Sequence, residues 1–368
     1  MIRYKDVKRG LALPPERISG VRSKLSCLGV DVLLFLDMKN IRYLIGFTGS
    51  EGALLIGENQ ALLLVDGRYV TQAKQEVEGV EIFEYKDKIE GIATAILYNG
   101  SQTVGFEAQA VSYDTYARLK ESLKGLKLKP VSDEIDTIRA IKDEREIALL
   151  RRAAEISSGA LTSIQDLLRP GVRERDIAFE LEFRMRHNGA EQVSFATIVA
   201  SGANTALPHA VPSTRKIENG DFIVIDCGAV YEGYHSDESC TFVVGQANDR
   251  QKETYRLVKD AHDRALDTVR AGVPCSEIDR VARTCIEEGG LGVYFSHGTG
   301  HGVGLDVHEA PRIAAKSKAV LEASMVLTIE PGVYIPGLWG IRIEDTVVVK
   351  ENGCEVLTKV LKDFKILN

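Results

Sequence analysis

Residues 297–309 read His297-Gly-Thr-Gly-His301-Gly-Val-Gly-Leu-Asp-Val-His308-Glu309 and contain three of the seven histidines in the chain. Four glycines lie between these histidines. Histidine is the commonest metal ligand and the usual acid or base near neutral pH, and glycine lets the backbone approach a ligand closely. The segment is therefore typical of a metal-dependent hydrolase site, and it predicts further ligands elsewhere in the chain.

Four carboxylates lie in or at the ends of strand-like runs rich in β-branched residues. They are Asp226 after Phe222–Ile225, Asp237, Glu330 after Met325–Ile329, and Glu344 within Gly340–Val349. An ionised carboxylate on an apolar strand is costly unless it is paired or bound to metal. Four carboxylates and one imidazole suit Mn(II), Co(II) or Zn(II) better than a thiolate site would. The Glu232-Gly233 pair predicts a turn that brings the two aspartates roughly opposite each other.

Composition limits the class of protein. The chain has 368 residues, enough for two domains, and its 44% apolar and 27% charged content is ordinary for a soluble globular protein. The net charge of −7 argues against a nucleic-acid partner. The polar N-terminus and the short apolar runs predict neither a secretory signal nor a membrane span, so we expect a cytoplasmic location without membrane partners. Six scattered cysteines favour reduced thiols.

The order of apolar runs predicts two domains, residues 1–135 and 136–368. In the first, strands are expected at 32–36, 52–56, 61–65 and 103–106, with helices at 15–28, 69–77, 88–98 and 113–124. This alternation favours an α/β domain with a mixed sheet.

The second domain shows a coarse internal repeat. Helices are expected from 143 and at 173–187, followed by strands at 193–200 and 222–245; helices at 250–271 and 276–288 then precede strands at 325–335 and 341–348. Two helices followed by strands, twice, predict two related halves.

The dispersed residues resemble the pita-bread metallopeptidases, the group of methionine aminopeptidase, Xaa-Pro aminopeptidase (aminopeptidase P) and prolidase. The family pattern Asp…Asp…His…Glu…Glu is matched at Asp226, Asp237, His301, Glu330 and Glu344. The resemblance covers the whole chain and implies an α/β (α+β) fold, with a creatinase-like N-terminal domain before a pita-bread catalytic domain. Asn40–Ser50 and Asp66–Tyr69 are similar to the creatinase/prolidase N-terminal domain.

The resemblance also implies a centre of two divalent ions. Manganese is favoured, with cobalt or zinc open. Asp226 would bind one ion, His301 and Glu330 the other, and Asp237 and Glu344 both. A metal-bridging hydroxide would attack the peptide bond, and Glu330 would carry the proton to the leaving nitrogen.

The remaining implied residues handle the substrate, a proline-containing peptide. His308 would donate to the scissile carbonyl oxygen, and His297 would line the pocket near the proline. His209, Tyr334 and Arg342 match the family's binding histidine, pocket tyrosine and supporting arginine.

Several residues near these positions have open or structural interpretations. Arg312 fits either a substrate carboxylate or an ordinary ion pair, and a non-catalytic role is expected for His187, His235 and His262. One departure stands out: where the family commonly reads Asp-x-Thr-Arg-Thr, this chain has Ser239-Cys240 in place of Thr-Arg, which leaves the tuning of the metals open.

The favoured function is an Xaa-Pro aminopeptidase, because Gly46–Gly52 is similar to bacterial members of that group. A prolidase, which takes dipeptides, is the alternative. Methionine aminopeptidases usually lack the N-terminal domain, creatinase does not keep the metal ligands, and an inactive peptide-binding module of the same fold would tend to lose them. A homodimer is expected from the resemblance alone.

Overall fold

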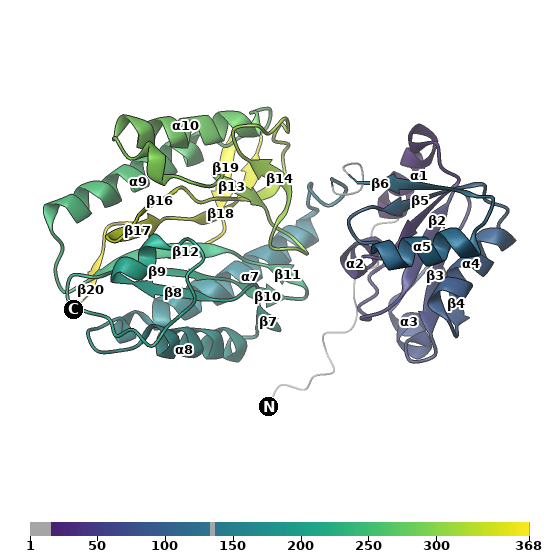
Figure 1. The fold of residues 1–368 in the computed structure, drawn as a ribbon, viewed down its shortest axis with the longest axis horizontal. Helices are drawn as coiled ribbons and strands as arrows, with labels where there is room; N and C mark the ends of the chain where they lie inside the picture. Colours follow the sequence, from purple (N-terminus) through teal and green to yellow (C-terminus); the bar gives the residue numbers. More distant parts are fainter. Residues whose placement is uncertain (1–15, 133–136, 368) are drawn as a thin grey trace. The chain divides into compact units, whose positions relative to one another are not determined.

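The computed structural model describes residues 16–132 and 137–367. The chain divides into two compact units, residues 1–135 and 136–368 (Figure 1). Among the described residues, no helix is long and apolar enough to cross a membrane.

The N-terminal unit is a six-stranded sheet with the strand order β4-β3-β2-β1-β5-β6. Its strands are β1 (Val32–Phe35), β2 (Ala53–Gly57), β3 (Ala61–Asp66), β4 (Glu81–Tyr85), β5 (Thr103–Glu107) and β6 (Lys127–Val131). Its helices are α1 (Glu16–Leu28), α2 (Met38–Ile45), α3 (Val70–Glu76), α4 (Lys88–Tyr98) and α5 (Tyr113–Ser122). The sheet is mixed, as predicted: β2 runs antiparallel to β1 and β3, and the other pairs are parallel.

Three elements of this unit are absent from the prediction. Strands β4 and β6 form the two edges of the sheet and carry exposed Glu81, Glu84 and Lys127. Edge strands are often protected by charged residues, so they lack a continuous apolar run. Helix α2 is capped by Asp37, whose side chain accepts a hydrogen bond from the Lys39 amide, but its eight residues are too few for a clear periodic pattern.

The C-terminal unit is built from two halves, each opened by two helices. They are α7 (Glu144–Ser163), α8 (Glu174–His187), α9 (Asp249–Thr268) and α10 (Cys275–Glu288). In Figure 1, α9 and α10 lie along one side of the unit and α8 along the other. The first helix of each half has a capping box, made by Asp143 with Glu146 in α7 and by Asn248 with Gln251 in α9.

Two main sheets lie between these helices, ordered β20-β12-β9-β8 and β14-β13-β15-β18-β19, with smaller sheets β11-β10-β7 and β16-β17. The strands of the first half are β7 (Gln192–Val193), β8 (Ile198–Ser201), β9 (Phe222–Cys227), β10 (Ala229–Tyr231), β11 (Tyr234–His235) and β12 (Glu238–Val244). Those of the second half are β13 (Gly300–Gly302), β14 (Glu309–Ile313), β15 (Val326–Ile329), β16 (Gly332–Ile335), β17 (Trp339–Arg342), β18 (Asp345–Lys350) and β19 (Gly353–Val356). Strand β20 (Ile366–Leu367) returns to pair with β12. Short 3-10 turns occupy Gln165–Leu167, Gly202–Ala206 (η2) and Gly292–Tyr294.

Each half has its own apolar core. One core packs α7 and α8 on β8, β9 and β12, and the other packs α9 and α10 on the strands of the second half. In each half an antiparallel pair forms the central ladder, β9 with β12 and β15 with β18. The repeat in the sequence therefore corresponds to two structural halves.

The prediction of long strands in this unit is wrong in one respect: the structure divides these strands into shorter ones. The predicted strand 325–335 is β15 and β16, which belong to different sheets and separate at Glu330-Pro331. Proline has no N–H to continue a ladder. The predicted strand 341–348 divides into β17 and β18, and 193–200 divides into β7 and β8. The predicted turn is present between β10 and β11, where Glu232 and Gly233 both have positive φ, 45° and 77°.

Candidate metal centre and active site

The five sequence-predicted ligands converge where strands end or are interrupted. Asp237, His301 and Glu344 each offer a ligand atom, and these atoms all lie within 4.8 Å of one another. The fourth member is Glu330, whose Oε1 is 3.6 Å from His301 Nε2, while Asp237 Oδ2 is also 3.6 Å from that nitrogen. Side chains leaving interrupted strands can turn toward one point, which a continuous ladder would prevent.

Asp226, the fifth, stands next to Asp237 but not directly opposite it. In the β9–β12 register Asp226 pairs with Ser239, so the two aspartates are diagonal neighbours, and the expectation of opposite positions needs this correction. Asp226 Oδ2 accepts a 2.7 Å hydrogen bond from Arg342 Nη2. Asp226 Oδ1 is buried and has no hydrogen-bond partner among the described residues, so one acceptor faces the cluster unsatisfied.

The carboxylates of the cluster would be stabilised as anions by a cation placed between them. Burial, followed by repulsion from neighbouring carboxylates, raises the pKa of Asp237 and of Glu344 well above the ordinary range. Burial raises the pKa of Glu330 to about 8, although Arg342 opposes that rise. Several carboxylates held together in a buried site repel one another unless positive charge lies between them.

The imidazole of His301 is suited to ligation. Burial lowers its pKa to about 4, with a further lowering by the charge of His308, so the ring is neutral near pH 7 and keeps a lone pair. Four carboxylates and one neutral imidazole form the donor set that hard or borderline divalent ions prefer. The residues present therefore fit a divalent metal centre.

Strand β13 holds His301 by close backbone packing. A Cβ at Gly300 would lie 1.9 Å from the Thr328 carbonyl oxygen, and one at Gly302 would lie 2.2 Å from the Ala310 carbonyl oxygen. Only glycine permits such an approach. The His301 amide donates to Thr328 Oγ1, and thus the strand carrying His301 is fixed to the strand that leads to Glu330.

Arg342 links the candidate ligand Asp226 to Tyr334 and, through Tyr334, to His297. It is buried, and besides Asp226 it donates to Ser239 Oγ at 2.8 Å and to the Tyr334 hydroxyl at 2.9 Å. His297 Nδ1 lies 2.7 Å from the Gly298 carbonyl oxygen, so Nδ1 donates there. His297 Nε2 then accepts from Tyr334, 2.9 Å away. Burial lowers the pKa of His297 to about 4, which keeps this ring neutral.

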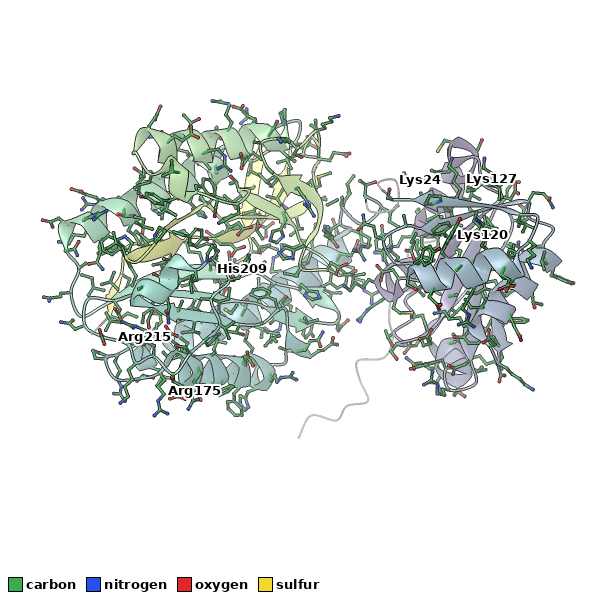
Figure 2. All side chains as sticks on the ribbon, in the orientation of Figure 1. Lys24, Lys120, Lys127, Arg175, His209 and Arg215 are labelled. Carbon is green, nitrogen blue, oxygen red and sulfur yellow. The ribbon has the colours of Figure 1, made fainter. Side chains whose placement is uncertain are left out.

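His308 and His209 are the exposed histidines of the site. The rings of His308 and His301 meet edge to face with centroids 4.3 Å apart. His209 follows η2 and lies in the middle of the C-terminal unit (Figure 2). Burial is the main cause that lowers the pKa of His297 and of His308, and the charge of His209 lowers both further, so His209 acts electrostatically on both rings.

The other histidines have structural surroundings. His187 stacks on Phe183, His235 Nδ1 lies 2.9 Å from Ser194 Oγ, and buried His262 lies between Asp263 and Asp345.

Sequence reasoning missed two supporting groups. Asp279 is fully buried in α10; it accepts hydrogen bonds from Thr299 N and Oγ1 and pairs with Arg283, which donates to the His297 carbonyl oxygen. An acid on the buried face of an amphipathic helix was the available signal. Lys362 places its ammonium 3.2 Å from Cys240 Sγ, at the departure from the family pattern. No local motif marks Lys362, because Glu238 and Cys240 are more than 100 residues away in the sequence and Asp345 lies on a separate strand.

Comparison with known proteins agrees with this geometry. Residues 148–351 match the model of metallopeptidase family M24, and residues 17–141 match that of the creatinase/prolidase N-terminal domain. The chain therefore belongs to metallopeptidase family M24, with the two-domain architecture of its creatinase/prolidase branch. Membership makes it a hydrolase that uses divalent metal.

Similar proteins carry two activity names. The chain is 40% identical to an Xaa-Pro dipeptidase of Pyrococcus furiosus over 95% of this chain and 99% of that protein. The structure of an Xaa-Pro dipeptidase from Bacillus anthracis superposes with a TM-score of 0.94 at 42% identity, covering 96% of this chain and 99% of the other. An X-Pro aminopeptidase from Thermotoga maritima gives 0.87 at 39% identity, covering 95% and 100%. The comparisons do not favour one activity over the other.

Proposed function

We propose that this chain is a metal-dependent exopeptidase that hydrolyses the bond between an N-terminal residue and proline. The observation that carries the proposal is the buried group of four carboxylates around the neutral imidazole of His301. The names of the similar proteins supply the Xaa-Pro specificity. Proline forms an amide without an N–H, so a dedicated pocket is needed to hold its ring.

Asp226, Asp237, His301, Glu330 and Glu344 would hold two divalent ions, with Asp237 and Glu344 shared between them. We propose Mn(II), and Co(II) or Zn(II) would satisfy the same donor set. When bound, these ions supply Lewis acidity and make a water acidic enough to be a nucleophile at neutral pH.

The residues of the chain then divide the remaining chemistry. Glu330 would take a proton from the attacking water and deliver it to the proline nitrogen as the C–N bond breaks. His308 would donate to the carbonyl oxygen, where negative charge develops. His209 and His297 would orient the substrate beside it. Tyr334 and Arg342 would hold the neutral His297 ring and the Asp226 carboxylate in place.

Arg312 bears on the choice between dipeptides and longer peptides. It lies on β14 directly across from His301 in the register, is exposed, and forms no ion pair within the described parts of the chain. Its charge contributes to lowering the pKa of both His301 and His308, after the larger effect of burial, so its guanidinium lies near both rings. This favours a role in binding the free carboxylate of a dipeptide, and with it the prolidase alternative.

The test is hydrolysis of Ala-Pro and Ala-Pro-Ala-Ala by the purified protein, with and without Mn(II). Metal-dependent cleavage of the tetrapeptide, alone or with the dipeptide, would establish the aminopeptidase. Cleavage of Ala-Pro alone would establish the dipeptidase. If the metal-loaded, folded protein cleaves neither peptide, the Xaa-Pro specificity is wrong.

The variant Arg312→Met sharpens this test. If Arg312 binds the dipeptide carboxylate, the KM for Ala-Pro should rise about tenfold with little change in kcat. A rise of about tenfold corresponds to the loss of one charge-assisted hydrogen bond. An equal effect on both peptides would contradict the assignment. The homodimer and the cytoplasmic location stay predictions.

A further inference from the structure

A buried cluster of charges lies directly behind the proposed metal centre. Lys362 Nζ donates to Glu238 Oε1 and lies 3.4 Å from Asp345 Oδ1. All three side chains are buried, with residue exposures of 7%, 0% and 6%. Buried carboxylates and ammonium groups are costly unless paired, so one cation placed between two acids is a specific arrangement.

The two acids occupy equivalent places in the two halves of the unit. Glu238 follows Asp237 at the start of β12, and Asp345 follows Glu344 at the start of β18. In extended backbone successive side chains point to opposite faces. When Asp237 and Glu344 face the cluster, their neighbours therefore face away from it, toward Lys362.

The first helix of each half completes the symmetry. Ser158 of α7 donates to Glu238 Oε2, and His262 of α9 lies 3.3 Å from Asp345 Oδ2. The remaining oxygen of each acid is the one that meets Lys362. The ammonium of Lys362 therefore contacts both acids. The same C-terminal stretch also reaches each acid, through Val360 N to Glu238 Oε1 and through Thr358 Oγ1 to Asp345 Oδ1.

Two hydrogen bonds also join these segments directly. The Glu344 amide donates to the Ser239 carbonyl oxygen at 3.2 Å, and Thr346 Oγ1 donates to the Asp237 carbonyl oxygen at 2.7 Å. Together with Lys362 they fix the separation of the two strand starts from which Asp237 and Glu344 project.

We propose that Lys362 is a positioning residue that sets the spacing of Asp237 and Glu344 and thereby the affinity of the centre for divalent metal. The inference rests on the proposed function of these two carboxylates as shared ligands. It assigns to the C-terminal segment a role in metal binding, through a side chain that does not itself touch the ligands.

The simpler alternative is that Lys362 only neutralises buried Glu238. Two variants separate these roles. Lys362→Met removes the ammonium and leaves Glu238 uncompensated, so the variant loses stability under either interpretation. The double variant Glu238→Gln with Lys362→Met removes one charge of each sign, keeps a side chain that can bond to Ser158, and still lacks the connection to Asp345.

The experiment is titration of the metal-free, full-length protein with Co(II), followed by calorimetry and visible absorbance, beside thermal melting without metal. Both variants are expected to bind Co(II) roughly 10- to 100-fold more weakly than the wild type, the range typical of residues that orient metal ligands. The double variant should melt closer to the wild type than the single variant does. The control is Lys365→Met, since the Lys365 side chain is exposed and its ammonium donates to Gln165, away from both acids.

Wild-type affinity in the double variant would overturn the inference and leave charge neutralisation as the role of Lys362. Unchanged affinity in Lys362→Met would overturn it as well. A wild-type protein that binds no Co(II) would instead refute the proposed metal centre, and the inference with it. Because metal binding is measured without peptide, failure of the Xaa-Pro specificity is distinguished from all these results.

Discussion

Among single residues, Glu330 combines two requirements that conflict without metal. It must be an anion to bind a cation, yet burial raises its pKa to about 8. Glu330→Gln keeps the shape and removes the exchangeable proton. We expect kcat for Xaa-Pro hydrolysis to fall by about 10²–10⁴-fold, the usual contribution of a general acid–base, with far-ultraviolet circular dichroism unchanged. Turnover within a few-fold of the wild type would refute the proton shuttle.

Glu107 makes a prediction about pH in the N-terminal unit. It accepts hydrogen bonds from the amides of Leu36 and Asp37 and from Asn40 Nδ2, but burial is the largest effect and raises its pKa to about 6. The unfolded value is about 4.3. Between these two values the folded state binds more protons than the unfolded state, so this contribution to stability is present below about pH 4 and is lost as the pH rises to about 6.

The size of this contribution follows from the shift, about 2 kcal/mol. The measurement is urea unfolding of the full chain in EDTA between pH 4 and 7, for the wild type and for Glu107→Gln. As the pH rises, the unfolding free energy of the wild type should fall relative to that of Glu107→Gln. If it stays constant or rises relative to that of the variant, the three hydrogen bonds outweigh burial.

At the scale of elements, the short strand β13 determines where His301 stands. A Cβ at Gly300 would collide with the Thr328 backbone oxygen, and backbone cannot give way as a flexible side chain can. Gly300→Ala should reduce the free energy of unfolding by about 2–3 kcal/mol, the cost of overpacking, and weaken Mn(II) binding because His301 moves.

The matched control is Gly159→Ala. Gly159 lies within α7, is exposed, and has nothing within 4 Å of an added Cβ. Alanine there should stabilise the chain by about 0.5–1 kcal/mol. Urea denaturation and Mn(II) calorimetry of both variants give the comparison; equal behaviour of the two would mean that β13 does not constrain His301.

For the molecule as a whole, the proposed metal centre would join the two halves of the C-terminal unit, since Asp226 and Asp237 come from one half and His301, Glu330 and Glu344 from the other. A ligand that binds only the folded state stabilises it, by about 2.7 kcal/mol at 100 times its Kd. Adding Mn(II) should therefore raise the Tm, and EDTA should reverse the rise.

The variant Asp237→Asn should lose most of this Mn(II)-dependent rise, whereas Asp249→Asn should keep it, because the Asp249 side chain is 91% exposed at the surface end of α9. Scanning calorimetry of the three proteins provides the measurement. Identical curves with and without Mn(II) for the wild type would argue against a metal centre that spans both halves.

Much of this protein was available from its sequence. The chemistry of divalent ions predicts Asp226, Asp237, His301, Glu330 and Glu344 as candidate ligands, and the repeated order of helices and strands predicts two halves. These features are local or periodic, so they can be predicted from the sequence without a structure.

The tertiary structure alone decided the rest. Packing between distant segments decides three features. It sets where the strands are interrupted, it places Asp226 opposite Ser239 rather than Asp237, and it lets Arg342 connect Asp226 with Tyr334. The same holds for Lys362, whose acids lie in different halves. Register and the pairing of buried charges are set by what each side chain meets across the core. A linear sequence specifies these contacts only through the fold as a whole.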